Sequence, residues 1–255
     1  MLSFKQFFKQ KNQGDNMPKK YLGCVVFDGD NTLWYNSHKY NEPALKCAEI
    51  ICKEFKEESP YYLDILKRFD EIDQAGVKQF GFGKERFPSS WVQTYQEFCQ
   101  KVGKIPLRRT EKLLYIEASK FWQPPFPMKK KARMVLRKLK ALGFYLVLLT
   151  GGDPEVQQMK IQANDIKKYF NEIKIVGTDK TKELESLASQ FGYNNVWMVG
   201  DSKKSDISKA IKAKVKAFYI PSVNWDYENW VCNDPETYCR FVIELKDIKE
   251  ILAYF

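Results

Sequence analysis

Short apolar runs alternate with longer amphipathic segments along most of the chain, and this alternation predicts its architecture. The apolar runs have the length and β-branched content of buried strands and lie at residues 24–27, 144–150, 173–177, 195–201 and 215–221. Apolar residues recur every three or four positions, as in helices, at residues 128–143, 153–165, 181–192, 205–213 and 244–255. Alternating strands and helices are typical of a doubly wound parallel sheet, so we predict a Rossmann-like α/β core.

A helical insertion follows the first strand. Four segments there have helical periodicity, at residues 41–55, 61–76, 89–103 and 110–122. The proline-rich stretch QPPFP at residues 123–127 ends this insertion, because consecutive prolines cannot continue a helix. We therefore predict an N-terminal tail at 1–20, a core formed by 21–36 and 124–255, and an inserted all-helical domain at 37–123.

Composition restricts the class of protein. With 255 residues and 44% hydrophobic content, the chain can bury a substantial core. The net charge of +10 is compatible with a nucleic-acid partner, but we favour a solvated lysine surface, and a phosphate-ester substrate would also favour a basic site. The six cysteines form no CxxC pair, which favours a reducing, cytoplasmic location over a zinc site or a disulfide framework.

Other classes are disfavoured by what the sequence lacks. The single histidine, His38, argues against a Ser-His-Asp triad or a multi-histidine metal site. No apolar run approaches the ~20 residues that a membrane span needs, and residues 1–16 lack the continuous apolar segment of a secretory signal. The tail has an apolar stripe formed by Leu2, Phe4, Phe7 and Phe8, which would suit a docking segment. We favour a mobile extension, because terminal residues are usually poorly ordered.

Polar residues follow the predicted strands where each one ends. Asp28 and Asp30 come after the first strand, Thr150 and Gly151 after the second, and Asp201 after the fourth. Because the carboxyl ends of parallel strands share one edge of the sheet, these residues are expected to meet there. Lys180 and Lys182, at the start of the third helix of the core, lie at the same edge.

Four sequence motifs in this order resemble those of the haloacid dehalogenase (HAD)-like hydrolase superfamily. The DxDx(T/V) motif is matched by residues 28–32 (DGDNT), and the apolar strand ending in Thr or Ser is matched by Thr150. The motif lysine is matched by Lys180, with Lys182 as the alternative, and GDxxxxD is matched by residues 200–206 (GDSKKSD). Any one motif is a weak signal, but four in order form a specific one. The resemblance covers the whole chain after the tail.

The resemblance implies the roles of these residues. Asp28 is expected to be the nucleophile and Asp30 its acid/base partner. A Mg²⁺ ion, which prefers hard oxygen ligands, would be held by Asp28, the backbone carbonyl of Asp30, Asp201 and Asp206. The substrate phosphate would be bound by Thr150, Gly151 and Lys180. The position of the insertion resembles the helical (C1-type) cap phosphatase subgroup, in which the cap covers the site.

We therefore predict a Mg²⁺-dependent phosphomonoester hydrolase that acts through an aspartyl-phosphate on a small phosphorylated metabolite or nucleotide. Asp30 supports this interpretation, because dehalogenases of the superfamily lack the second aspartate and the metal. Two alternatives stay open: a phosphomutase with the same residues, and a nucleic-acid-end phosphatase or binding module of the same fold. The natural substrate and the oligomeric state are not determined by the sequence.

Two further parts of the sequence are weaker candidates for contacts with a substrate or a partner. The least helix-like part of the insertion, residues 81–87, contains Lys84 and Arg86, for which contact with an anionic substrate group competes with a solvated surface. Trp225 and Trp230 favour packing against the core over a partner surface. The sequence DGDNTL resembles the start of an EF-hand loop, but Leu33 stands where that loop requires glycine.

Overall fold

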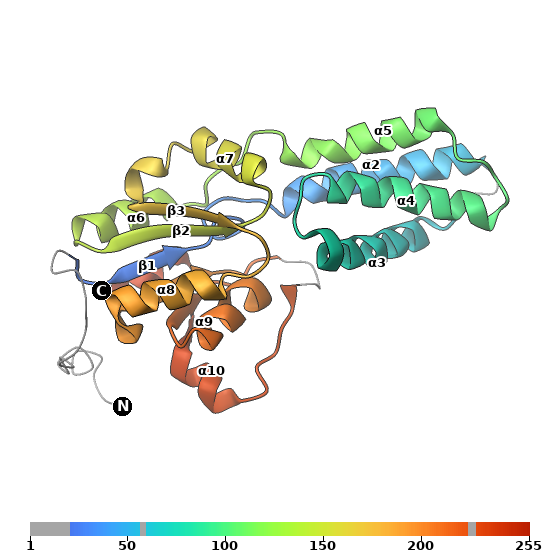
Figure 1. Ribbon diagram of the computed structural model, residues 1–255. Helices are drawn as coiled ribbons and strands as arrows, with labels where there is room; N and C mark the ends of the chain where they lie inside the picture. The colour runs from blue at the N-terminus through green and yellow to red at the C-terminus, as the bar shows by residue number, and fades with distance from the viewer. Residues whose placement is uncertain (1–20, 57–59, 224–227) are drawn as a thin grey trace. The chain divides into compact units, whose positions relative to one another are not determined.

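The computed structural model describes residues 21–56, 60–223 and 228–255, which divide into two compact units (Figure 1). Unit 1 comprises residues 21–35, Pro127–Gly151 and Asn164–Phe255, and unit 2 comprises Asn36–Phe126 and Gly152–Ala163. The predicted tail and Trp225 lie outside the described residues. Within them, no helix is both long and apolar enough to cross a membrane.

Unit 1 is built around a six-stranded parallel sheet, which confirms the predicted Rossmann-like core. The strand order is β3-β2-β1-β4-β5-β6. The strands are β1 (Cys24–Phe27), β2 (Tyr145–Gly151), β3 (Glu172–Val176), β4 (Val196–Gly200), β5 (Lys216–Tyr219) and β6 (Val242–Glu244). The strand β1 is central and pairs in parallel with both β2 and β4. Because it is covered on both faces, all four of its residues are apolar and buried.

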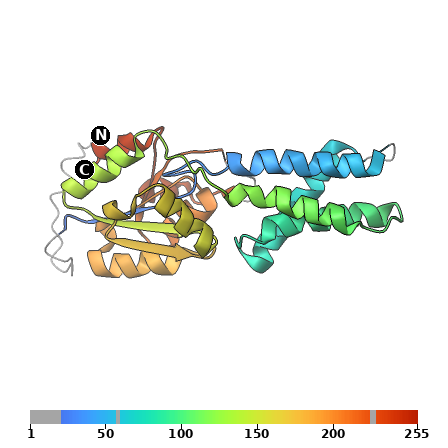
Figure 2. The ribbon, with the colours of Figure 1, turned by 90° about the horizontal axis from the view of Figure 1, so that it is seen from above.

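Helices cover both faces of this sheet (Figure 2). Alternate strand residues such as Val26, Val147 and Met198 pack against α8 (Thr181–Phe191) and α9 (Ser208–Lys212). The opposite face lies against α6 (Ala132–Ala141) and the 3₁₀ helix η7 (Ile248–Ala253), which contact each other. The C-terminal Phe255 adds an edge-on ring contact with Trp197 of β4.

The C-terminal part of unit 1 differs from the predicted elements. Within the predicted helix at 244–255 only η7 is helical, and it is a 3₁₀ helix; it follows β6 and α10 (Pro235–Phe241), neither of which was predicted. The α10 helix begins with a capping signal that the periodicity did not register: Asp234 Oδ1 accepts hydrogen bonds from the backbone N–H groups of Glu236 and Thr237. The β6 strand has only three residues and lies at the sheet edge, so it leaves almost no alternation pattern in the sequence.

Unit 2 is helical, as expected of the insertion. It contains α2 (His38–Phe55), α3 (Tyr62–Phe80), α4 (Arg86–Lys101) and α5 (Arg108–Ala118), followed by the 3₁₀ helix η2 (Ser119–Trp122). Its core is rich in aromatic rings, among which Phe69 stacks on Trp91 with 4.0 Å between ring centroids. The unit also includes α7 (Pro154–Ala163), which the sequence pattern assigned to the core.

The two cationic residues of the 81–87 segment have partners inside unit 2. The backbone N–H of Lys84 donates to Asp153 Oδ2 at 3.1 Å, and its ammonium group pairs with Glu155 at the start of α7. Arg86 is only 8% exposed, so the interpretation as a solvated surface was wrong for it. Its Nη1 pairs with the buried Asp73 carboxylate and donates to the Asp73 carbonyl oxygen at 3.2 Å.

We expect Arg86→Met to lower the free energy of unfolding by about 3–5 kcal/mol, because it leaves the Asp73 carboxylate buried without its cation. Urea denaturation measures this change. Arg68→Met is the matched control, because Arg68 pairs with Glu97 where the arginine side chain is 37% exposed. Its loss should stay below about 1 kcal/mol. Equal losses in the two variants would contradict the account of the buried pair.

Candidate active site

The first part of the site is the turn that follows β1. The Asp28 backbone N–H still belongs to the sheet and donates to Val199 O at 2.9 Å. The chain then reverses, because the N–H of Leu33 donates to Gly29 O at 2.8 Å. Gly29 is required there, since a Cβ atom at this position would lie 2.3 Å from the Trp34 ring and 2.9 Å from Thr150 Oγ1. The same geometry places the Thr150 hydroxyl beside the aspartate turn.

Two side chains of this turn hold the acidic groups in place. Trp34 Nε1 donates to Asp30 Oδ1 at 2.5 Å, which fixes the orientation of this carboxyl group. Thr32 Oγ1 donates to Asp201 Oδ1 at 3.0 Å and so connects the first motif to the fourth. Both supporting residues are buried. Sequence reasoning did not assign either role, although Thr32 is the last residue of the first motif.

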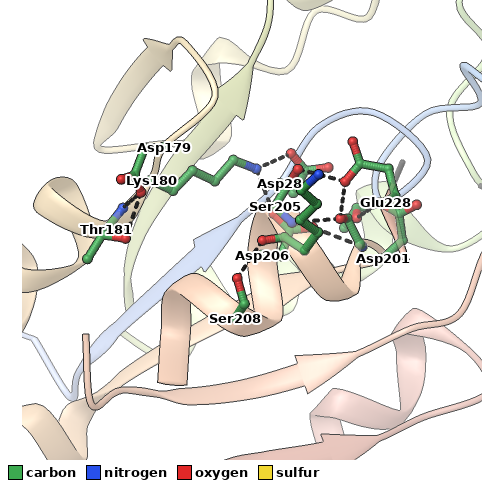
Figure 3. Close-up of polar contacts among 12 residues, drawn as sticks. Asp28, Asp179, Lys180, Thr181, Asp201, Ser205, Asp206, Ser208 and Glu228 are labelled. Carbon is green, nitrogen blue, oxygen red and sulfur yellow. Dashed lines mark hydrogen bonds and ion pairs between the residues drawn. The ribbon is translucent and has the colours of Figure 1, made fainter. Parts of the chain in front are cut away.

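Lys180 joins two of the aspartates. Its Nζ atom lies 2.5 Å from Asp28 Oδ1 and 2.7 Å from Asp206 Oδ1 (Figure 3). The lysine directly precedes α8, where Asp179 Oδ1 accepts a hydrogen bond from the Thr181 N–H at 2.9 Å. Lys182, the alternative candidate, is exposed. The structure thus brings Lys180 into contact with the first and fourth motifs.

The fourth motif forms a tight turn after β4. The turn continues into η5 (Lys203–Ile207), a π-helical turn that carries Asp206. The Ser202 N–H donates to Asp206 Oδ2 at 3.1 Å, so this carboxylate is held by both a backbone amide and Lys180. A Cβ atom on Gly200 would lie 2.3 Å from Asp206 Oδ2, which explains the glycine before Asp201.

Three of the predicted metal ligands come together. One carboxylate oxygen from each of Asp28, Asp201 and Asp206 lies within 4.8 Å of the others, and all three residues are buried. Buried carboxylates of like charge repel each other unless a cation joins them. Their hard oxygen donors suit Mg²⁺, which binds proteins through a few carboxylates and keeps several waters. The residues therefore fit the predicted ion.

The remaining predicted residues end β2. Thr150 is fully buried and pairs with Ile175 of β3 in the sheet register, and Gly151 is the last residue of the strand. The parallel sheet therefore places this second motif beside the Asp28 turn, as the sequence predicted. All seven predicted site residues belong to unit 1.

The electrostatics of the site are those of an excess of buried acid. Burial, together with the charges of Asp206 and Asp30, raises the pKa of Asp28 to about 7 against the opposing effect of Lys180. Burial lowers the pKa of Lys180, but the charges of Asp206 and Asp28 outweigh it and hold this pKa above its ordinary value. Both raised pKa values show that the negative charge of the site exceeds what Lys180 alone offsets, so a further cation would be stabilised there.

Lys129 is a second cation near the acidic residues, and the sequence analysis missed it. Burial lowers the pKa of Lys129, while the charges of Asp201 and Asp28 act in the opposite direction. Its backbone N–H donates to Leu33 O at 2.8 Å, which fastens it to the aspartate turn. The residue is part of a run of three lysines, and nothing in such a run distinguishes the one that turns inward.

Comparison with known proteins establishes the family. Residues 22–214 match the model of the haloacid dehalogenase-like hydrolase family, so the chain belongs to this family of hydrolases. This match confirms the resemblance seen in the four motifs. No curated protein sequence matched the chain.

Solved structures show the same fold at low sequence identity. A haloacid dehalogenase-like family hydrolase from Xanthomonas campestris has a TM-score of 0.72 at 20% identity, covering 95% of this chain and 94% of its own. A predicted phosphoglycolate phosphatase from Haemophilus somnus has a TM-score of 0.54 at 17% identity, with 92% and 98% covered. A 2-haloacid dehalogenase from Pseudomonas syringae has a TM-score of 0.50 at 18% identity, with 91% and 97% covered. Proteins named for different reactions thus share this fold.

Proposed function

We propose that this chain is a Mg²⁺-dependent phosphomonoester hydrolase that acts through an aspartyl-phosphate intermediate on a small phosphorylated metabolite or nucleotide. The observation that carries the proposal is the buried contact of Lys180 with both Asp28 and Asp206, next to Asp201. Such a group of charges suits the transfer of a phosphoryl group, because the reaction brings an anionic nucleophile toward an anionic substrate.

In this proposal, Asp28 attacks the phosphorus atom and the ester oxygen leaves. Lys180 neutralises charge on Asp28 and on the substrate phosphoryl group, since its compact ammonium group already contacts Asp28 Oδ1. Thr150 donates its hydroxyl to a phosphoryl oxygen, and the Gly151 backbone lies beside it at the end of β2. When bound, Mg²⁺ supplies the positive charge that offsets the repulsion between carboxylate and phosphate.

Asp30 is proposed to move the proton. It first protonates the leaving oxygen and then accepts a proton from the water that hydrolyses the aspartyl-phosphate. The Trp34 indole supports this role, because its 2.5 Å hydrogen bond sets the direction of the Asp30 carboxyl group. A proton-transfer group must be held at a defined position to act in both steps.

The acid content of the site favours a phosphatase over a dehalogenase. Displacement of a halide by Asp28 would need neither a proton donor at Asp30 nor a metal held by Asp201 and Asp206. Lys180 offsets only part of the charge of the three buried carboxylates, so their presence favours a further cation and metal-assisted chemistry. A phosphomutase would use the same residues, and the assay below separates the two reactions.

The test is phosphate release from an aryl phosphate and from a panel of sugar, nucleotide and oligonucleotide phosphates, with Mg²⁺ and with EDTA. We expect release with at least one substrate, which EDTA abolishes and added Mg²⁺ restores. A short 2-haloacid is the counter-substrate, and halide release from it without metal would overturn the proposal. Isomerised substrate without free phosphate would indicate the mutase reaction. Phosphate release from none of the substrates would also reject the hydrolase.

A further inference from the structure

Glu228 binds the turn of the fourth motif from a distant part of the chain. It lies in the connection between β5 and α10, outside all four motifs. Its carboxylate accepts hydrogen bonds from the hydroxyl groups of Ser202 and Ser205, the latter at 2.7 Å (Figure 3). A hydrogen bond from an uncharged hydroxyl to a carboxylate is stronger than one between neutral groups. Glu228 therefore holds two positions of one short turn at once.

The two serines are connected directly to the proposed metal ligands. The Ser205 N–H donates to Ser202 Oγ at 2.8 Å, and the Ser202 N–H donates to Asp206 Oδ2 at 3.1 Å. Ser202 follows Asp201 and Ser205 precedes Asp206 in the sequence. A chain of hydrogen bonds thus runs from Glu228 through the turn to the Asp206 carboxylate.

The π-helical shape of this turn indicates what these hydrogen bonds stabilise. Ser202 caps η5, a π-helical segment that contains Ser205, and such wide turns are rare and frequently lie at functional sites. The backbone N–H groups of Asp206 and Ile207 both donate to Ser202 O at 3.1 Å, and side-chain bonds add to this backbone frame. The Ser202 side chain, which accepts from the Ser205 N–H, is one of these bonds, and Glu228 orients that hydroxyl.

We propose that Glu228 is a positioning residue for the metal site: it fixes the Ser202–Ser205 turn so that Asp201 and Asp206 are held ready for a divalent cation. This inference rests on the proposed function, since it takes Mg²⁺ as the ion. Glu228 also adds one negative charge beside the site, which strengthens the attraction for a divalent cation. Residues that support metal ligands in this way commonly change metal affinity by about 10–100-fold when they are replaced.

Direct Mg²⁺ titration by isothermal calorimetry tests the proposal without relying on turnover. The variants are Glu228→Ala, which removes both bonds and the charge, and Glu228→Gln, which removes the charge and keeps one acceptor. We expect the dissociation constant for Mg²⁺ to rise about tenfold in the alanine variant and less in the glutamine variant. Glu185→Gln is the charge-matched control, because Glu185 is exposed on α8.

A double-mutant cycle with Ser205→Ala checks that Glu228 acts through the serines. If it does, the effects of Glu228→Ala and Ser205→Ala on Mg²⁺ affinity will be less than additive. Urea denaturation in EDTA is the second measurement, and we expect Glu228→Gln to unfold at the wild-type midpoint. A purely structural role would instead lower that midpoint and leave the Mg²⁺ affinity of the folded protein unchanged.

The outcomes separate this inference from the function on which it rests. Wild-type protein that binds no Mg²⁺ rejects both the proposed function and the role of Glu228. Wild-type protein that binds Mg²⁺ while both Glu228 variants stay within twofold of it rejects the positioning role alone. If the dissociation constant for Mg²⁺ rises as much in the Glu185→Gln control as in Glu228→Gln, the positioning role is also rejected, because the effect would then come from net charge.

Discussion

The Asp28→Asn variant is expected to keep its fold and to lose phosphatase turnover by at least about 10⁴-fold, a loss typical of removing a nucleophile. Asparagine has the shape of aspartate and can still accept a hydrogen bond from Lys180, but its amide does not form a phosphoryl intermediate. Because burial raises the pKa of Asp28 to about 7, an uncharged side chain there relieves an electrostatic cost. The metal-free variant should therefore be at least as stable as the wild type.

Steady-state phosphate release and urea denaturation in EDTA measure the two parts of this result. Asp165→Asn is the matched control, because Asp165 is exposed and has a φ of 45°, a conformation that asparagine tolerates well. The control should retain wild-type turnover. Phosphate release that survives in Asp28→Asn would reject Asp28 as the nucleophile, even if metal dependence were kept.

The second large effect is expected for Lys180→Met, in stability as well as in activity. Lys180 lies between the buried carboxylates of Asp28 and Asp206, so methionine leaves both without their shared cation. Breaking a buried ion pair in this way costs about 3–5 kcal/mol. Turnover should fall to the background rate, since the lysine contacts the proposed nucleophile.

The stability loss in Lys180→Met should depend on pH and on metal. Lys180 lowers the pKa of Asp28, so its removal shifts that pKa further above 7. A carboxyl group with a raised pKa destabilises the folded state where it is forced to ionise, and protonation removes this cost. Urea denaturation in EDTA should therefore show a larger loss at pH 8 than at pH 5.5, and Mg²⁺ at pH 8 should recover part of it.

Lys182→Met, an exposed neighbour of Lys180, is the control for that experiment. It should change neither turnover nor the unfolding midpoint by a measurable amount, because an exposed lysine contributes little to the free energy of unfolding. An equal loss at both pH values in Lys180→Met would show that the cost comes from packing rather than from unpaired carboxylates.

The parallel core was predictable because its central strands are buried on both faces. Such strands read as continuous apolar runs, and β1 and β4 consist entirely of buried residues. The sixth strand was missed because three residues at a sheet edge carry no such signal. The sequence pattern assigned α7 to the core, whereas α7 groups with unit 2, in which Lys84 bonds to Asp153 just before this helix. Contacts of this kind join residues far apart in sequence and leave no local pattern.

In the site, too, some residues could be predicted from their position in the sequence and others could not. Asp28, Thr150, Lys180 and Asp201 stand at the ends of strands or helices, where topology alone brings them together. The residues that support them carry no such positional signal. Neither Trp34 nor Glu228 stands at a motif position, and only the folded chain shows the carboxyl group or the hydroxyls that they bind.

The central place of β1 in the sheet has a consequence for how the chain folds during synthesis. Its two neighbours in the sheet are β2, at Tyr145–Gly151, and β4, at Val196–Gly200. The strand that is made first therefore waits until most of the protein has left the ribosome before it can pair on both sides. The helices α3, α4 and α5, in contrast, each pack against the next helix along the chain, and contacts of this kind form quickly. An apolar strand that stays unpaired for so long is a natural target for chaperones.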